Sequence, residues 1–261
     1  MEIVNPGRCD LVAWPIVKVD APLGAAAWRT AWSELAVPFR RCLELAWESC
    51  SSGTFACGAV ITDPAGNVVA EGRNRAFDRP SGEYPLEGTA LAHAEMNALA
   101  RVPTGVALDD CTLWSSLEPC LMCLSSALLS SVGEIRYLAP DPLWDGVEDL
   151  PSLNAFVERR CPLHHDPHDG EWAVLGMTFA LHLFAFWQPV DSQALAAHDV
   201  CEPETAALVR RWVTDRTLVE LASNAATVEE VLATVWDDVA EAARNRSTRQ
   251  HAGHDTRATP S

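Results

Sequence analysis

The sequence predicts a protein of the α/β class, because short runs rich in β-branched residues alternate with stretches of helical periodicity. The strand-like runs lie between residues 57 and 138, and the pattern turns helical after residue 189. The chain has 261 residues, of which 48% are hydrophobic, so it can bury a core of its own. We therefore expect a sheet covered by helices, followed by an α-helical C-terminal extension.

The N-terminal part contains an arm, a helical stretch and a hairpin. Residues 1–22 hold three prolines and show no clear period, so we expect an extended arm. From 23 to 50, apolar residues recur at spacings of three and four, which predicts helix. The β-rich runs 57–63 and 68–72 flank a turn made of proline, glycine and asparagine. This pattern predicts a β-hairpin.

The middle of the chain alternates between helices and strands. A loop over 73–90, with two prolines and two glycines, leads into a helical segment over 91–101. Beyond it we expect a strand over 112–115, a helix over 121–129 and a strand over 134–138. Alternation of this kind favours a sheet that lies between helices.

The C-terminal part is predicted to be mostly helical. Residues 140–172 are loop-rich with one helix near 152–160, and residues 173–187 fit either a helix or a strand. Further helices are expected over 205–222 and 227–243, and the polar, arginine-rich end is expected to be disordered. The predicted division is an N-terminal arm and helix (1–36), a main domain (37–190), a helical C-terminal extension (191–243) and a disordered tail (244–261).

The charge balance argues against a general nucleic-acid binder. The chain has 36 acidic and 19 basic residues and a formal net charge of −17, which repels phosphate backbones. Most of the excess acid lies between residues 141 and 243. No apolar run is long enough to span a bilayer, and no signal-peptide pattern is evident. With an odd count of nine cysteines, this favours reduced thiols and a cytoplasmic protein that does not bind membranes.

One constellation carries chemistry: His93-Ala-Glu95, followed by Pro119-Cys120 and Cys123. A histidine and two cysteines form a donor set that Zn²⁺ prefers, and three protein ligands leave a fourth position open. Cys120 and Cys123 lie three residues apart, so their thiolates share one side of a helix start. Glu95 lies close enough to carry protons near the metal. The pattern H-x-E…P-C-x-x-C is a known signature of zinc nucleobase deaminases.

Each part of this constellation has an ordinary explanation when taken alone. A lone C-x-x-C is often a structural zinc half-site or a redox pair. His93 or Glu95 alone would more often be an ordinary helix residue. The combination favours one catalytic zinc ion per chain.

Four longer motifs extend the pattern: Gly58-Ala-Val-Ile, Glu71-Gly-Arg-Asn-Arg, His93-Ala-Glu-Met-Asn-Ala-Leu and Ser116-Leu-Glu-Pro-Cys-Leu-Met-Cys. In this order they resemble the cytidine and deoxycytidylate deaminase superfamily, most of all its branch of guanine deaminases and tRNA adenosine deaminases. The resemblance covers about residues 37–140 and leaves the C-terminal part unmatched. It implies a three-layer α/β/α fold with a mixed sheet of about five strands, so the main domain would be the deaminase domain.

The resemblance also implies roles for individual residues. Glu95 matches the proton shuttle, and the zinc ligands would be His93, Cys120 and Cys123. The substrate-binding groups would be the side chain of Asn74, the amide of Ala94, the carbonyl of Ser116 and, at the position that packs on the base, Cys57.

Two departures from the family pattern bear on the substrate. The pair Ala56-Cys57 replaces the Pro-Phe or Pro-Val of many relatives, which weakens stacking on the base and disfavours guanine. Eighteen residues separate Asn74 from His93, where close tRNA adenosine deaminases have few. This loop is therefore either a substrate lid or a tolerated surface insertion.

These observations predict a zinc-dependent hydrolytic deaminase that removes an exocyclic amino group from a small nucleobase, nucleoside or related heterocycle and releases ammonia. Deamination of adenosine in tRNA or another polynucleotide stays open, with Arg73, Arg75 and Arg79 as its support. A catalytically idle zinc-binding partner subunit also stays open. Because relatives form dimers or tetramers, a homodimer is a further open expectation.

A second cluster of metal-binding residue types lies in the loop-rich stretch: Cys161, His164, His165 and His168. Its C-x-x-H spacing suits a second metal, but two prolines and no clear helix favour a solvated polar loop. A third interpretation is that this loop borders the active site.

Overall fold

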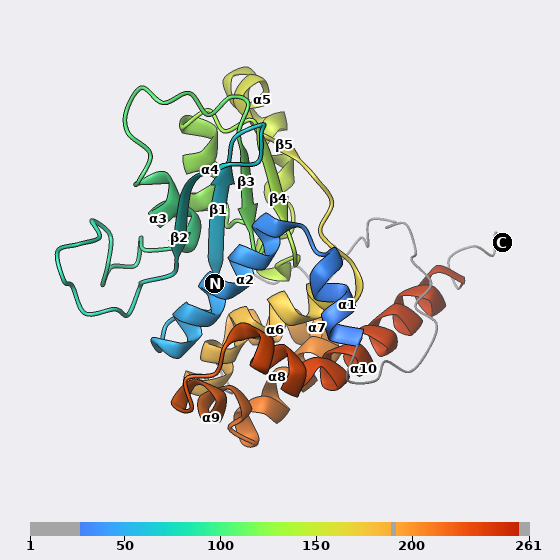
Figure 1. Cartoon of the computed structure of the whole chain (residues 1–261). Helices are drawn as coiled ribbons and strands as arrows, with labels where there is room; N and C mark the ends of the chain where they lie inside the picture. The colour runs from blue at the N-terminus through green and yellow to red at the C-terminus, as the bar shows by residue number, and fades with distance from the viewer. Residues whose placement is uncertain (1–26, 189–191, 256–261) are drawn as a thin grey trace.

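The computed structural model describes residues 27–188 and 192–255, and all structural statements below refer to these residues. The predicted arm over 1–22 lies outside them. Five strands form one sheet in the order β2-β1-β3-β4-β5 (Figure 1). The strands are β1 (Gly58–Thr62), β2 (Val68–Arg73), β3 (Thr112–Ser115), β4 (Glu134–Tyr137) and β5 (Leu163–His164).

The sheet is mixed, as expected from the motifs. Strand β1 runs antiparallel to both β2 and β3, whereas β3, β4 and β5 run parallel to one another. The predicted hairpin is β1–β2. The α/β class and the mixed five-stranded sheet are therefore confirmed, although the two-residue strand β5 has no sequence signal of its own.

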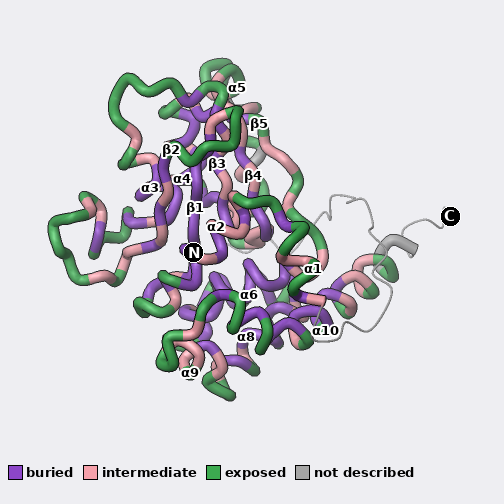
Figure 2. The backbone as a smooth tube through the Cα atoms, in the orientation of Figure 1, coloured by how far each residue is buried: buried purple, intermediate pink, exposed green. Residues whose placement is uncertain are grey.

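Helices cover both faces of the sheet. Strand β1 is buried along its whole length, and its side chains alternate between the two faces: Val60 packs with α2 (Val37–Ser51), whereas Ala59 and Ile61 pack with α3 (Ala94–Leu99) and α4 (Leu121–Leu129). Figure 2 shows β1 as a continuous buried segment. Because a strand buried on both faces needs apolar residues at every position, Gly-Ala-Val-Ile suits this place.

Two glycines let the helices approach the sheet closely. A Cβ at Gly58 would lie 2.1 Å from the carbonyl oxygen of Cys42 in α2. A Cβ at Gly72 would lie 2.4 Å from the carbonyl oxygen of Ala94 in α3. Any side chain at these positions would push the helices off the sheet, so glycine fixes the distance between the layers.

The remaining helices lie mostly below the sheet in Figure 1. They comprise α1 (Ala27–Glu34), α5 (Ala155–Arg160), α6 (Gly170–Trp187), α7 (Gln193–Cys201), α8 (Pro203–Thr214), α9 (Thr217–Ser223) and α10 (Val228–Asp255), with 3₁₀ turns η1 (Pro142–Trp144) and η2 (Val147–Leu153). The stretch over 173–187 that fitted helix or strand is thus helical. No helix of the described ranges is both long and apolar enough to cross a membrane.

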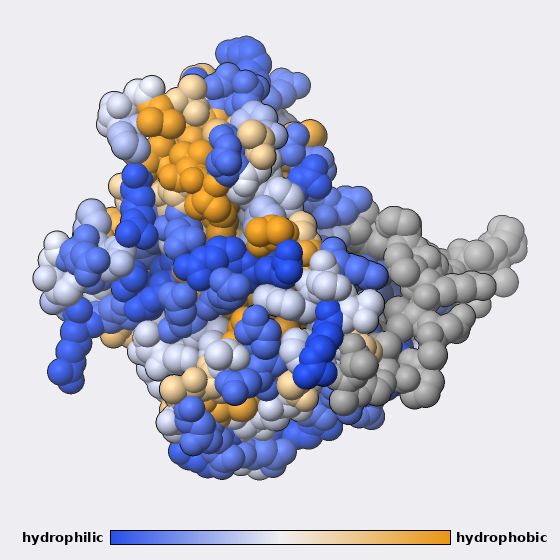
Figure 3. Space-filling model, viewed as in Figure 1, coloured by the Kyte–Doolittle hydropathy of each residue, from blue (hydrophilic) through white to orange (hydrophobic). Residues whose placement is uncertain are grey.

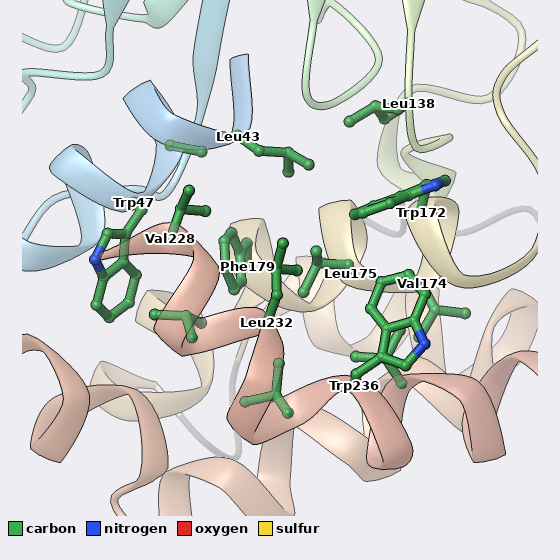
Figure 4. Close-up of a cluster of buried hydrophobic side chains, with 14 of the residues drawn as sticks. Leu43, Trp47, Leu138, Trp172, Val174, Leu175, Phe179, Val228, Leu232 and Trp236 are labelled. Atoms are coloured by element: carbon green, nitrogen blue, oxygen red, sulfur yellow. The ribbon is translucent and has the colours of Figure 1, made fainter. Parts of the chain in front are cut away.

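A shared hydrophobic core joins the C-terminal helices to the sheet domain. Helix α6 is buried on almost every side, and it packs between α2 and the helices α8 and α10. Figure 4 shows side chains of α2, α6 and α10 in one cluster, in which the rings of Trp172 and Trp236 lie 4.9 Å apart. The indole of Trp47 donates a hydrogen bond to the carbonyl oxygen of Ala226 at 2.6 Å. The extension is therefore packed into the protein rather than appended to it.

The prediction of a disordered tail over 244–261 is wrong for residues 244–255, which continue helix α10. Arg246 is buried, and its guanidinium donates hydrogen bonds of 2.7 and 2.8 Å to the carboxylate of Glu202. A polar composition suggested solvent exposure, but this arginine has a buried acidic partner far away in the sequence. Residues 256–261 lie outside the described ranges.

The prediction of reduced thiols holds for seven cysteines, and Cys201 is the exception among the described residues. The seven, which include the candidate ligands, carry free thiols. Cys201, at the end of α7, is disulfide-bonded.

Candidate zinc centre and active site

Two helix starts bring the three predicted zinc ligands together. His93 is the N-cap residue of α3, Cys120 is the N-cap residue of α4, and Cys123 lies in the first turn of α4. The Nδ1 atom of His93 lies 3.6 Å from each of the two sulfurs, and the sulfurs lie 3.6 Å from each other. The positive ends of both helices face this point, which favours thiolates there.

This triangle has the dimensions of a zinc site. Tetrahedral zinc binds sulfur at about 2.3 Å and nitrogen at about 2.0 Å, which requires ligand atoms about 3.5–3.8 Å apart. The three separations of 3.6 Å meet that requirement. One histidine and two cysteines suit zinc rather than calcium or magnesium, and they leave a fourth position for water or substrate.

The two thiols differ in acidity. The pKa of Cys120 is lowered to about 4, chiefly by its side-chain hydrogen bond with Cys123 and also by its hydrogen bond with His93. The pKa of Cys123 is raised, first by that same hydrogen bond and then by burial. The charged form is therefore already favoured at Cys120.

Glu95 lies beside this triangle in the first turn of α3. Its carboxylate is buried, and Oε1 accepts a hydrogen bond from Oγ of Ser115 at 3.0 Å. Oε2 accepts one from Sγ of Cys123 at 3.3 Å. Burial raises the pKa of Glu95 above its ordinary value. A carboxyl group that is held in place and has a raised pKa is suited to take up and deliver a proton.

A pocket of about 150 Å³ opens onto the metal site, and its walls are mainly apolar. His93, Glu95 and Cys120 line it, together with Cys57 and Asn74. The C-terminal helices supply a further wall that sequence reasoning missed: Ala180, Leu181 and Phe184 from α6, and Ala194 and His198 from α7. The segment after β4 contributes Asp141, Leu143 and Trp144.

Asn74 is held so that its amide nitrogen is available to a ligand. Its side chain is buried, and Oδ1 accepts hydrogen bonds from Oγ1 of Thr54 at 2.7 Å and from the backbone amide of Ala76 at 3.0 Å. Since Oδ1 is occupied, the group that Asn74 offers the pocket is the Nδ2 donor. Asn74 lines the pocket, and its role as a substrate contact stays a prediction.

The other predicted substrate contacts divide into two groups. Ala94 and Cys57 line the pocket, and burial raises the pKa of the Cys57 thiol, so it presents a neutral surface. Ser116 does not belong to the lining among the described residues. Its hydroxyl accepts a hydrogen bond from the Gly58 amide at 3.1 Å, and its carbonyl oxygen lies 2.6 Å from where a Cβ of Gly176 would stand. A role for the Ser116 carbonyl stays a prediction.

The second cluster of metal-binding residue types does not assemble. The ranges described here contain one group of three such side chains with ligand atoms close together, and it is the one at His93. His165 instead lies 3.2 Å from Glu134 through Nε2, and Nδ1 of His168 lies 3.1 Å from the carbonyl oxygen of Asp169. His164 belongs to β5. In the described residues these four side chains therefore form no second group of close ligand atoms.

The fold and the site together define an α/β protein with a candidate zinc centre of one histidine and two cysteines. Residues 33–139 match the family described as the cytidine and deoxycytidylate deaminase zinc-binding region. Through this region, which is about two fifths of its length, the chain is similar to the cytidine deaminase superfamily.

Individual relatives share only part of their length with this chain. It is 33% identical to the tRNA-specific adenosine deaminase of Haemophilus influenzae over 39% of this chain and 56% of that protein. It is 33% identical to the guanine deaminase of Bacillus subtilis over 38% and 61%. A tRNA(Ile)-lysidine synthase of Deinococcus radiodurans is 34% identical over 53% of this chain and 24% of its own length. The chain thus spans between a quarter and three fifths of these curated relatives.

Solved structures show similar partial likeness. The guanine deaminase structure from Bacillus subtilis has a TM-score of 0.34 at 26% identity, over 60% of this chain and 94% of that one. A structure from work on A-to-I editing by tRNA:A34 deaminases has a TM-score of 0.40 at 23% identity, over 50% and 91%.

Proposed function

We propose that this protein is a zinc-dependent hydrolytic deaminase acting on a small aminated heterocycle. The observation that carries the proposal is the position of Glu95, whose Oε2 lies 3.3 Å from Sγ of the predicted ligand Cys123 at the wall of the pocket. A structural zinc site has no need of a buried carboxylate beside it, and it normally has four protein ligands. The open position and the carboxylate together support hydrolysis.

The reaction replaces an exocyclic amino group by oxygen and releases ammonia. Bound zinc supplies Lewis-acid activation of water. Glu95 takes a proton from the attacking water, delivers it to the ring nitrogen next to the reacting carbon, and then passes a proton to the leaving amine. Asn74 orients the ring through Nδ2, and the apolar walls from α6 keep bulk water out. One water is consumed and one ammonia leaves, so the atoms balance.

Editing of a polynucleotide is the second candidate, since one relative is named a tRNA-specific adenosine deaminase. Its support in the sequence was the arginine group near the pocket. Arg73 and Arg75 both bind Asp78, at 2.7 and 2.9 Å, and Arg75 also stacks over the ring of Tyr84. Arginines that are already paired give little attraction for phosphates.

On the nearby surface, too, a basic side chain is already paired with acidic ones. Figure 3 shows a hydrophilic band across the middle of the molecule, where α2 lies. On α2, Arg41 binds Glu44, Glu48 and Glu71, so this cation is neutralised as well. These pairs favour a small substrate over a polynucleotide. An idle partner subunit is disfavoured by the retained Glu95.

The test is ammonia release from a panel of free bases, nucleosides, nucleotides and s-triazines. Glu95→Gln serves as the blank, and Glu83→Gln, which alters an exposed loop residue, is the matched control. We expect release from at least one compound, its loss in Glu95→Gln and its retention in Glu83→Gln. Release only from tRNA, together with salt-sensitive binding, would support the polynucleotide candidate instead. Zinc-loaded protein that is silent on both would contradict a catalytic role.

A further inference from the structure

His198 is a buried histidine in the pocket wall with one unused polar atom. It lies on α7, outside the region that matches the family, and its side chain is 2% exposed. Its Nδ1 atom lies 2.9 Å from the carbonyl oxygen of Ala194. In the described part of the chain, Nε2 has no hydrogen-bond partner. Buried polar atoms without partners are rare and costly, so such an atom in a pocket wall calls for a ligand.

The hydrogen bonding fixes what Nε2 can do. A carbonyl oxygen only accepts, so Nδ1 carries the proton and Nε2 of the neutral ring is an acceptor. Burial lowers the pKa of His198 and outweighs the carboxyl groups that face it, those of Asp141, Glu202 and Asp199. Arg246 already binds the carboxylate of Glu202. The imidazole is therefore neutral at physiological pH and presents a lone pair.

Helix α7 holds this histidine firmly. The hydroxyl of Ser192 caps the helix by accepting a hydrogen bond from the Leu195 amide at 3.3 Å. Ala194 and Leu195 pack against Leu181 and Val209 in a separate apolar cluster. A ring fixed in this way has lost its rotational freedom before a ligand arrives, which favours selective hydrogen bonding.

We propose that His198 is a specificity-determining residue whose Nε2 accepts a hydrogen bond from a ring N–H of the substrate. This inference rests on the proposed deaminase function and names the substrate class: an aminated heterocycle that keeps a free ring N–H. The exocyclic amino group must point at Glu95 and the metal site, so the donor that reaches His198 is a different N–H. Nε2 has almost no exposed surface in this structure, so a ligand reaches it only when the side chains that cover it shift. The turn η1 packs on α7 and lines the same pocket.

The chemistry of the common bases makes this a choice between free bases and nucleosides. In adenine and in cytosine the ring N–H is the atom that carries the sugar in the nucleoside. Guanine has a second ring N–H on the six-membered ring. A site that accepts from a ring N–H therefore discriminates strongly against the derivative that lacks it, because the acceptor is then left buried and unpaired.

His182 provides a matched control. It is also a buried histidine, 6% exposed, and its Nε2 atom also has no partner within the described ranges. It lies on α6 but does not line the pocket. A general effect of altering a buried histidine would thus show up equally at both positions.

The experiment measures dissociation constants by calorimetry with zinc-loaded Glu95→Gln protein, which binds without turnover. The probes are adenine with 9-methyladenine, cytosine with 1-methylcytosine, and guanine with its 1-methyl and 9-methyl derivatives. For the base that binds, we expect methylation of one ring N–H to weaken binding about tenfold to a hundredfold. Adding His198→Phe should reduce that ratio to about one, adding His198→Gln, which keeps an acceptor, should retain part of it, and adding His182→Gln should leave it unchanged.

The outcomes separate the two proposals. Equal binding of a base and all its methyl derivatives, or a ratio that survives in His198→Phe, would overturn the role of His198 while leaving the deaminase function intact. Absence of ammonia release from the wild-type protein would overturn the deaminase function, whereas the binding ratio would still report on His198. If His198→Phe does not fold, the His198→Gln and His182→Gln proteins decide, since only the first should change the ratio.

Discussion

Ser115, the last residue of β3, donates a hydrogen bond from Oγ to Oε1 of Glu95 at 3.0 Å, and both side chains are buried. The bond joins the sheet to the helix that carries His93. It leaves Oε2 toward the metal ligands, where Cys123 lies 3.3 Å away. Ser115 therefore holds one oxygen of the proposed proton carrier, and the other oxygen faces the predicted metal ligand Cys123.

Removing this bond should slow turnover without unfolding the protein. We expect Ser115→Ala to lower kcat by about tenfold to a hundredfold and to leave KM nearly unchanged, because groups that orient catalytic side chains contribute on this scale. Ser126→Ala is the control, since that hydroxyl only bonds the carbonyl oxygen of Met122 within α4. Steady-state kinetics with circular dichroism checks both variants. An unchanged kcat in Ser115→Ala would show that Glu95 needs no such support.

Zinc content should depend on the three ligands and not on the second cluster. We expect purified Cys120→Ser to lose most of its zinc, and Cys161→Ser to retain about one ion per chain as measured by mass spectrometry. Chelation should also lower the melting temperature of the wild-type protein, because an ion that binds only the folded state stabilises it. Zinc loss in Cys161→Ser would revive the second site.

The pair Arg246–Glu202 should contribute strongly to stability. Arg246→Met leaves a buried carboxylate with its main cation removed, and we expect a loss of about 3–5 kcal/mol in the free energy of unfolding. The double variant with Glu202→Met should recover much of this loss. Arg210→Met, which breaks an exposed pair with Asp199, should cost under about 1 kcal/mol. Urea unfolding measures all three, and a small effect of Arg246→Met would mean that α10 is held by its apolar face alone.

The candidate metal site was predictable from the sequence because its ligand types follow local spacings. Cys120 and Cys123 lie three residues apart at a helix start, and His93 and Glu95 lie within one turn. Such local spacings can be recognised without knowledge of the tertiary fold. Strands β1 to β4 have four or more residues and were predictable from the sequence. Strand β5 has only two residues, and its place is set by pairing with β4.

The rest of the site depends on tertiary packing and leaves little local signal. Phe184 and His198 reach the pocket only because α6 and α7 fold back over the sheet domain. From the sequence alone, Arg246 belongs to the predicted disordered tail, because its partner Glu202 lies forty-four positions earlier in the chain. The sequence offered one cue to His198, which is a polar residue that follows the apolar residues Ala194 and Leu195 on α7. That pattern fits an ordinary core histidine equally well.

The last prediction concerns stability at acid pH. Burial lowers the pKa of His182 from 6.5 to about 4, so between these values the unfolded chain binds a proton that the folded protein does not. By linkage, stability falls as the pH drops from about 6.5 to about 4 and then levels off, with a loss approaching about 3 kcal/mol from this group. His198 shifts in the same direction and adds to the slope. We expect His182→Gln to flatten the dependence of the unfolding free energy on pH in this window, as measured by urea titration. An equally steep slope in His182→Gln would place the acid sensitivity elsewhere.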